Sequence, residues 1–280
     1  MADGSKIEWT EVTWNPTTGC DRISAGCDHC YALTMAKRLK AMGSAKYQND
    51  GDPRTSGPGF GVTTHDYTLT EPLNWPTPKT VFVNSMSDLF HARVPLEFVA
   101  RVWVTMARTP QHTYQILTKR PERLARLVGG PLDGGHLLLE AVGDEPTYLA
   151  LYDAEWPLPN VWLGTSIESD EHTGRADHLR KTVAAVRFIS AEPLLGPLAS
   201  LDLTGIDWLI IGGESGRGAR PMDLGWARDL IAMARDSDTA VFVKQLGAVW
   251  AGGGKGGDWS LWPEDLRVRE YPLTTGWVKA

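Results

Sequence analysis

Short apolar runs rich in Val, Ile and Phe recur along the chain, and each one ends in small polar residues. The runs are Thr80–Val83, Thr113–Leu117, Val161–Leu163, Val186–Ile189, Trp208–Ile211 and Ala240–Val243. Near-continuous apolar runs of this length are typical of strands that are buried on both faces, which indicates a parallel sheet. An opening strand near Glu8–Trp14 would bring the number of strands to seven.

Segments with apolar residues at helical spacing lie between these runs. They are Tyr31–Met42, Pro95–Ala107, Pro121–Val128, Asp170–Val183 and Asp223–Arg235. Pro95 suits the first position of its helix, and Asp223 suits the N-cap of the last one. Strands that alternate with helices are typical of repeated βα units. Six or seven such units predict an α/β protein with a complete or partial TIM-type barrel of mainly parallel strands, rather than an open sheet.

Three segments rich in Gly, Pro or small polar residues interrupt this alternation, near residues 43–78, 129–159 and 247–263. The second segment contains His136–Ala141 and Tyr148–Tyr152, each of which fits a short helix or part of a hairpin. No clear boundary between two domains is visible. We therefore expect one domain over residues 1–280, with the three segments as inserted loops.

The charge and the apolar content exclude some classes of protein. The chain has 280 residues and a formal net charge of −6, which disfavours general binding to nucleic-acid phosphates, so we expect little DNA binding by the protein alone. No stretch approaches the ~18 apolar residues of a membrane span, and the first residues lack the pattern of a signal peptide. An odd number of clustered cysteines also argues against a disulfide framework. These features predict a cytoplasmic protein without membrane contact.

The only three cysteines of the chain lie within eleven residues, at Cys20, Cys27 and Cys30. Three thiolates can hold three corners of a four-iron cluster and leave one iron open to another ligand. They can equally hold zinc if a fourth ligand, such as one of the seven histidines, comes from elsewhere. The sequence therefore predicts one metal centre, with an iron–sulfur cluster as the first interpretation, zinc as the second and bare thiols as the third.

Polar residues follow the predicted strands, where a parallel barrel carries its functional groups. Any strand must end in a polar loop, but six ends with charged residues beside small ones favour a ligand site. The Gly212–Gly218 loop fits either an anion cradle or a tight turn. The basic run from Lys119 to Arg126 is more typical of a solvated helix face, with Lys119 and Arg120 as its better site candidates. The predicted cofactor-binding residues are Asn84, Ser85, Ser87, Asp88, Lys119, Thr165, Ser166, Glu168, Glu192, Gly212, Gly213 and Glu214.

Twelve tryptophans are many for a chain of this length, and several lie in the irregular segments. Exposed aromatic side chains commonly anchor a protein partner, whereas buried ones simply pack loops onto a core. Both explanations stay open for these residues. The tryptophans predicted as partner-binding are Trp156, Trp250, Trp259 and Trp262.

Several strings in the chain resemble one known family. The opening Trp14-Asn15-Pro16…Gly19-Cys20, followed by Gly26-Cys27-x2-Cys30-Tyr31-Ala32, resembles the signature of phage-associated radical-SAM-like proteins of unassigned function. The resemblance covers nearly the whole chain. It continues at Asn84-Ser-Met-Ser-Asp-Leu-Phe90, Leu117-Thr-Lys-Arg-Pro121, Trp162-Leu-Gly-Thr-Ser166, Ser190-Ala-Glu-Pro-Leu-Leu-Gly196, Ile211-Gly-Gly-Glu-Ser-Gly216, Lys244-Gln-Leu-Gly247 and Leu266-Arg-Val-Arg-Glu270.

This resemblance implies a radical-SAM-like barrel whose cysteines bind a four-iron (4Fe-4S) cluster and whose open iron binds S-adenosylmethionine. Radical-SAM enzymes carry Cys-x3-Cys-x2-Cys, whereas the first gap here is six residues and only the second gap agrees. Those enzymes often hold the amino group of S-adenosylmethionine with Gly-Gly-Glu after the second strand, where this chain has Asn84–Asp88. The string Gly212-Gly213-Glu214 follows the sixth strand instead. Polar groups after the fourth strand, such as Thr165, Ser166 and Glu168, would suit the ribose.

The resemblance also implies an alternative without catalysis. Some phage proteins that resemble this chain are recombination directionality factors, which bind a large serine integrase and switch it from integration to excision. In that function the barrel is a scaffold, any metal is structural, and the partner is the integrase encoded by the same phage. Its contact surface would contain the four tryptophans named above.

Overall fold

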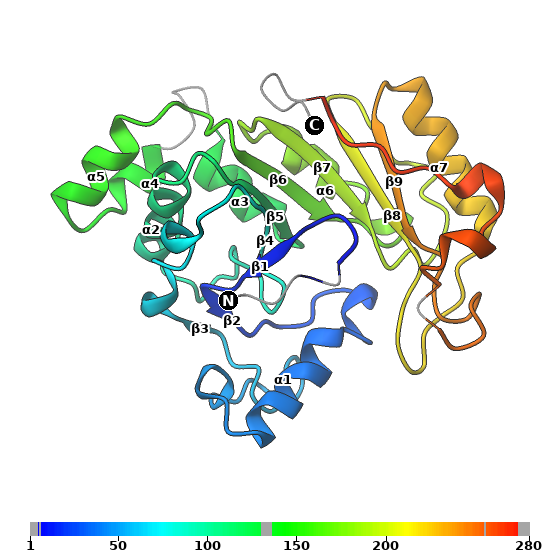
Figure 1. Ribbon diagram of the computed structural model, residues 1–280, viewed down its shortest axis with the longest axis horizontal. Helices are drawn as coiled ribbons and strands as arrows, with labels where there is room; N and C mark the ends of the chain where they lie inside the picture. The colour runs from blue at the N-terminus through cyan, green and yellow to red at the C-terminus, as the bar shows by residue number, and fades with distance from the viewer. Residues whose placement is uncertain (1–4, 6, 130–135, 255, 274–280) are drawn as a thin grey trace.

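Seven parallel strands form the central sheet of the protein. The computed structural model describes residues 5, 7–129, 136–254 and 256–273. The strands lie in the sheet in sequence order, and every neighbouring pair is parallel (Figure 1). They are β1 (Val12–Trp14), β4 (Thr80–Val83), β5 (Thr113–Thr118), β6 (Val161–Ser166), β7 (Val186–Ala191), β8 (Trp208–Gly212) and β9 (Ala240–Gln245).

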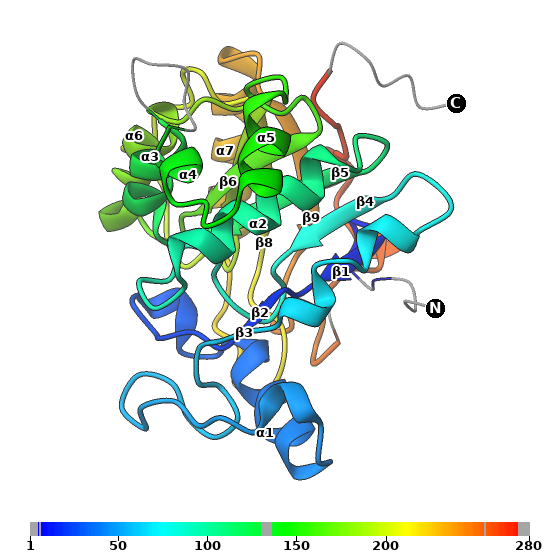
Figure 2. The ribbon, with the colours of Figure 1, turned by 90° about the vertical axis from the view of Figure 1, so that its left-hand side faces the viewer.

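Seven α-helices occur in the described residues. They are α1 (Tyr31–Ala41), α2 (Leu96–Ala107), α3 (Pro121–Val128), α4 (His136–Glu140), α5 (Glu145–Tyr152), α6 (Arg175–Arg180) and α7 (Leu224–Asp236). Helix α6 packs on β6 and β7, and α7 packs on β9. In Figures 1 and 2, α1 lies apart from the other helices. In the chain it comes after β2 (Thr17–Thr18) and before β3 (Thr63–Thr64), which form a small antiparallel pair.

The sheet is an open half-barrel. The strands β1 and β9 are its two edges, and within the described residues they pair with no strand that would close the barrel. The α/β fold with parallel strands is therefore confirmed in its partial form. None of the described helices is both long and apolar enough to cross a membrane.

Alternation along the strands divides the core into two parts, because successive side chains of a strand point to opposite faces. One set, which includes Val81, Ile116, Leu163 and Leu209, packs against the helices in the main core. The opposite set faces the inside of the half-barrel. There it forms a second buried cluster, which we call the aromatic plug and which consists of Trp9, Phe82, Trp162, Val186, Phe188, Trp208, Ile210 and Phe242.

Trp208 lies at the centre of the aromatic plug. Its ring centroid lies 5.8 Å from those of both Trp162 and Phe188 and 5.9 Å from that of Phe242. Gly164 makes room for this packing, because a Cβ atom there would lie 2.4 Å from the Phe188 ring. The plug fills the amino-terminal half of the inner face, so the space left inside the half-barrel lies toward the carboxyl ends of the strands.

The observed elements differ from the expected ones mainly in the irregular segments. The predicted helix Asp170–Val183 is only α6 preceded by a single 3-10 turn, Asp170–His172. In segment 129–159 the expected short elements are helices rather than a hairpin, and α4 and α5 both pack on α2. Segment 43–78 holds β3 and three short 3-10 turns.

Candidate cofactor site at the carboxyl ends of the strands

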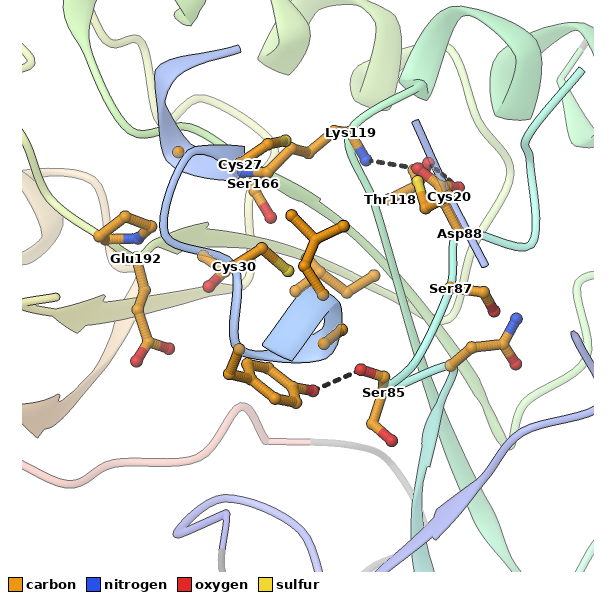
Figure 3. Close-up of a pocket in the computed structure, with 18 of the residues that line it drawn as sticks. Cys20, Cys27, Cys30, Ser85, Ser87, Asp88, Thr118, Lys119, Ser166 and Glu192 are labelled. Carbon is orange, nitrogen blue, oxygen red and sulfur yellow. Dashed lines mark hydrogen bonds between the residues drawn. The ribbon is translucent and has the colours of Figure 1, made fainter. Parts of the chain in front are cut away.

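A cavity of about 260 Å³ opens above the aromatic plug. Trp9, Phe82 and Leu117 contribute apolar surface to it, and the rest of the lining combines polar residues from the ends of the strands with residues of the cysteine-bearing loop and α1. Because the strands are parallel, their carboxyl ends meet at one edge, and inward-facing side chains near the ends of β4, β5, β6, β7 and β9 reach the cavity. All three cysteines line the same cavity (Figure 3).

The cysteines come from the segment between β2 and α1. Gly19, just before Cys20, has φ of +84°, and a Cβ atom there would lie 2.2 Å from the carbonyl oxygen of Gly61. Only glycine therefore allows this turn. Cys27 ends a short 3-10 turn, and Cys30 is the N-cap residue of α1. All three are free thiols.

Cys20 lies beside an ion pair at the end of β4. Arg120 Nη1 is 3.3 Å from the Cys20 sulfur and 2.9 Å from Asp88 Oδ2. Burial and the Asp88 charge raise the pKa of Cys20 to about 12, although Arg120 acts in the opposite direction. Burial also raises the pKa of Cys30. Without a bound metal, these two thiols therefore stay protonated at neutral pH.

The thiols do not form a preformed ligand cage. In the described part of the chain, no three His, Cys, Asp or Glu side chains are arranged to hold a metal ion. A zinc site needs such a closed set with a fourth ligand, and no described histidine completes one. His29, the histidine between Cys27 and Cys30, has its Nδ1 atom 3.0 Å from Glu214 Oε2.

Two carboxylates at the rim of the half-barrel, just after β6 and β8, already have hydrogen-bond partners within the protein. Glu168 is fully buried, and its Oε2 atom accepts hydrogen bonds from Lys119 Nζ at 3.1 Å and Arg175 Nη1 at 2.9 Å. Burial opposes the ionisation of Glu168, but the two cations outweigh it and lower its pKa to about 2. Glu214 is also buried, and Arg220 and His29 hold its pKa at about 2 against the effect of burial.

A third carboxylate at this rim, Glu192, is paired with residues of β9. Lys244 Nζ lies 2.7 Å from Glu192 Oε1, and Gln245 Nε2 donates to the same oxygen at 2.8 Å. Both Glu192 and Lys244 line the cavity, and their side chains keep 17% and 16% of their surface exposed. This pair can therefore contact a bound ligand with either charge.

Asn84, which lines the cavity, carries a buried hydrogen-bond acceptor without a partner in the described part of the chain. Its side chain is 3% exposed, and its Nδ2 atom donates to Thr17 Oγ1 at 2.7 Å. Its Oδ1 atom has no hydrogen-bond partner among the described residues. A buried acceptor without a partner lowers the stability of the folded state, so a ligand that donates a hydrogen bond to it would gain affinity by removing this penalty. Nearby, the Tyr31 hydroxyl donates to the Ser85 carbonyl oxygen (Figure 3).

The structure brings most of the predicted cofactor-binding residues to this cavity. Thr165 is an exception, because it is buried on the opposite face and donates to the Thr118 carbonyl oxygen at 2.9 Å. Glu168 and Gly212 also lie outside the cavity lining. The predicted residues that line the cavity are Asn84, Ser85, Ser87, Asp88, Lys119, Ser166, Glu192, Gly213 and Glu214.

Sequence reasoning missed several lining residues. Strand alternation could have identified Ser190 and Lys244, which occupy the inward-facing positions at the ends of β7 and β9. No local pattern marks Trp9 or Tyr31 as lining residues. The solvated helix face expected for Lys119–Arg126 is wrong for Arg123, whose Nη2 atom donates to the Val94 carbonyl oxygen at 2.7 Å. Lys119 and Arg120, which the sequence marks as the better site candidates of this run, both line the cavity.

The four candidate partner-binding tryptophans pack against the protein itself. Trp262 is 2% exposed and belongs to the main core, while Trp156, Trp250 and Trp259 are partly buried against that core. The Arg269 guanidinium lies over the Trp259 and Trp262 rings. Binding of a protein partner by these residues stays a prediction, but Trp262 offers almost no surface for it.

Comparisons with known proteins place the chain in a family without assigning a function. The model of a family described as "Protein of unknown function (DUF5131)" matches residues 4–257. No curated protein matches the chain. Among solved structures, spore photoproduct lyase complexed with dinucleoside spore photoproduct is 14% identical with a TM-score of 0.43. A cysteine-to-serine mutant of that enzyme is 15% identical with a TM-score of 0.44. Each match covers 85% of this chain, which spans 64% of the matched one.

Proposed function

The chain belongs to the DUF5131 family of proteins of unknown function, and we propose that it is a radical-SAM-like protein. In this proposal Cys20, Cys27 and Cys30 bind one four-iron–four-sulfur cluster, and S-adenosylmethionine occupies the adjoining cavity. The observation that carries the proposal is that all three free thiols line one cavity at the carboxyl ends of a parallel half-barrel.

The donor set fits such a cluster better than it fits zinc. A four-iron cluster with three thiolate ligands leaves one iron open, so it needs no fourth protein ligand. The cysteines supply the soft thiolate ligands that iron–sulfur centres use, and Arg120 beside Cys20 favours the thiolate form of that residue. When bound, the cluster would supply the electron for reductive cleavage of S-adenosylmethionine.

The polar rim would bind and orient the second cofactor. In this proposal Asn84, a lining residue whose buried Oδ1 atom has no partner among the described residues, would accept a hydrogen bond from an amino or hydroxyl group of the cofactor. Glu192 and Lys244 offer one negative and one positive group to the same cavity from the ends of β7 and β9, nearer the other edge of the sheet. Below them, Trp9, Phe82 and Leu117 exclude water from the base of the cavity, which protects reactive species from side reactions.

Anaerobic reconstitution with iron and sulfide tests the cluster. We expect about four iron and four sulfide ions per wild-type chain and a brown protein. Each of the variants Cys20→Ser, Cys27→Ser and Cys30→Ser should lose most of both. Ile23→Ser is the matched control, because it places a serine at an exposed position of the same loop without removing a thiol. Colourless wild-type protein without sulfide would overturn the proposal.

Release of 5′-deoxyadenosine tests the second cofactor. Reconstituted wild-type protein with S-adenosylmethionine and dithionite should release it, whereas the cysteine variants should not. If the protein with a fully loaded cluster neither binds S-adenosylmethionine nor releases 5′-deoxyadenosine, the cluster part of the proposal would stand and the radical-SAM part would be refuted.

A further inference from the structure

We propose that Glu168 and Glu214 are positioning residues that clamp the cysteine-bearing loop, residues 20–30, onto the ends of β6 and β8. This inference rests on the proposed cluster for its purpose, but the clamp itself is a property of the protein without a cofactor. It assigns the two carboxylates a different task from the direct cofactor contact that the sequence predicts.

Glu168 holds the middle of the loop. Its Oε1 atom accepts a hydrogen bond from the Gly26 backbone N–H at 3.3 Å. The approach is so close that a Cβ atom on Gly26 would lie 3.0 Å from the Glu168 carboxyl carbon. The other oxygen is held by Lys119 and Arg175, which fixes the carboxylate from the side of the sheet. Glu168 therefore joins two anchored cations to the loop backbone.

Glu214 holds the loop from the other side. Its Oε2 atom lies 3.0 Å from His29 Nδ1 and also accepts hydrogen bonds from the Arg220 backbone N–H at 2.8 Å and from Nε at 3.0 Å. Arg220 extends the contact, because its Nη2 atom donates to the Ala25 carbonyl oxygen at 2.9 Å. Its Nη1 atom is also 3.6 Å from Asp28 Oδ2. One buried carboxylate thus organises contacts to three loop residues.

The two clamp points bracket Cys27. Gly26 precedes it, and His29 lies directly before Cys30. The described thiols do not themselves form a closed ligand group, so the loop must depend on other contacts for its conformation. Charge-assisted hydrogen bonds from buried carboxylates are suited to this task, since they are stronger than neutral ones. Loss of either carboxylate should therefore increase local opening of the cysteine-bearing loop without unfolding the sheet.

Hydrogen–deuterium exchange of the apo protein tests the clamp. The reporters are the Cys27, Asp28 and Cys30 amides, which bond within the loop to the carbonyl oxygens of Ser24, Ala25 and Cys27. We expect exchange of this peptide to rise by about tenfold in Glu168→Gln and Glu214→Gln, the change that loss of one strong hydrogen bond produces. Peptides from β7 and β8 should exchange as in the wild type.

Glu192→Gln is the matched control. Glu192 is another rim carboxylate paired with a lysine, but it forms no hydrogen bond or ion pair with residues 20–30 in the part of the chain that the structure describes. In Glu192→Gln, hydrogen–deuterium exchange of the loop amides should equal that of the wild type. Because Glu168→Gln deprives two partly buried cations of their carboxylate and can fail to fold, Arg220→Gln provides a second variant. The Arg220 side chain is 30% exposed, and its loss removes the contact with Ala25.

A second readout connects the clamp to the cluster. In reconstituted protein, iron release to a chelator should be at least about threefold faster in Glu214→Gln and Arg220→Gln than in Glu192→Gln. Unchanged loop exchange in these variants would overturn the clamp even if the cluster forms. Faster loop exchange in a protein that never takes up iron would instead support the clamp and refute the proposed function.

Discussion

The Arg120 guanidinium lies 3.3 Å from the Cys20 sulfur, although 100 residues separate the two in the chain. The same guanidinium donates hydrogen bonds to the backbone carbonyl oxygen of Asp21, the residue after Cys20, at 3.1 Å and to Asp88 Oδ2 at 2.9 Å. The end of β5 therefore fixes the start of the cysteine-bearing loop. It also places a permanent positive charge beside the one thiol whose pKa rises to about 12.

Alkylation of the apo protein should show this relationship. Because burial and Asp88 raise the pKa of Cys20 to about 12, we expect iodoacetamide to modify Cys20 at pH 8 at least about tenfold more slowly than free cysteine. Arg120→Met removes the cation that opposes this shift and should slow the reaction further. Peptide mass spectrometry measures the rates, with Arg101→Met as a control remote from the cysteines. Faster alkylation of Cys20 in Arg120→Met would contradict the prediction.

Substitution of Asn84 should weaken the binding of S-adenosylmethionine. The variant Asn84→Ser removes the buried acceptor that has no partner among the described residues, so we expect about tenfold weaker binding, equivalent to one hydrogen bond. Isothermal titration calorimetry on reconstituted protein measures the change. Asn49→Ser is the control, because Asn49 bonds to Thr63 outside the cavity lining. Equal affinities of the two variants would exclude a contact with Asn84.

The aromatic plug should tolerate no side chain at Gly164. In Gly164→Ala the new Cβ atom would lie 2.4 Å from the Phe188 ring, and the ring is packed against Trp208 and cannot move freely. We expect the free energy of unfolding to fall by about 1–3 kcal/mol. Gly196→Ala is the control, since a Cβ atom there meets nothing within 4 Å. Urea unfolding that gives equal stability for both variants would show that the plug adapts.

His65 should make the protein less stable in acid. It is 6% exposed, and burial together with Lys46 lowers its pKa from 6.5 to about 4. The unfolded chain binds a proton at this residue more tightly than the folded chain does. Stability is therefore unaffected above pH 6.5, falls between pH 6.5 and 4 by up to about 1.4 kcal/mol per pH unit, and levels off below pH 4.

The variant His65→Gln isolates this contribution. It keeps a side chain that can bond to Thr18 Oγ1, which lies 2.8 Å from His65 Nε2, but it does not titrate. We expect its free energy of unfolding, measured by denaturant titration at several pH values, to depend less steeply on pH between 6.5 and 4. Parallel curves for wild type and variant would refute the assignment.

Local patterns in the sequence were sufficient for most of the strands and helices and for locating the cysteine cluster. The run Thr80–Val83 is β4 without any change of bounds, and Tyr31–Met42 differs from α1 only at its last residue. The spacing of apolar residues depends on which face of a segment is buried. Apolar residues recur every two positions in a strand and every three to four positions in a helix, so both elements can be recognised from neighbouring residues alone. The clustering of Cys20, Cys27 and Cys30 is equally local, which is why it could be read directly.

Only the tertiary structure decided which groups meet and which face each one takes. Thr165 and Ser166 are adjacent and both polar, yet the pleat of β6 sends one toward the helices and the other into the cavity. His29 and Glu214 are 185 residues apart, and no periodicity along the chain connects them. Such pairs form because parallel strands bring their carboxyl ends to one edge, where buried charges must find partners from whichever loop is nearest.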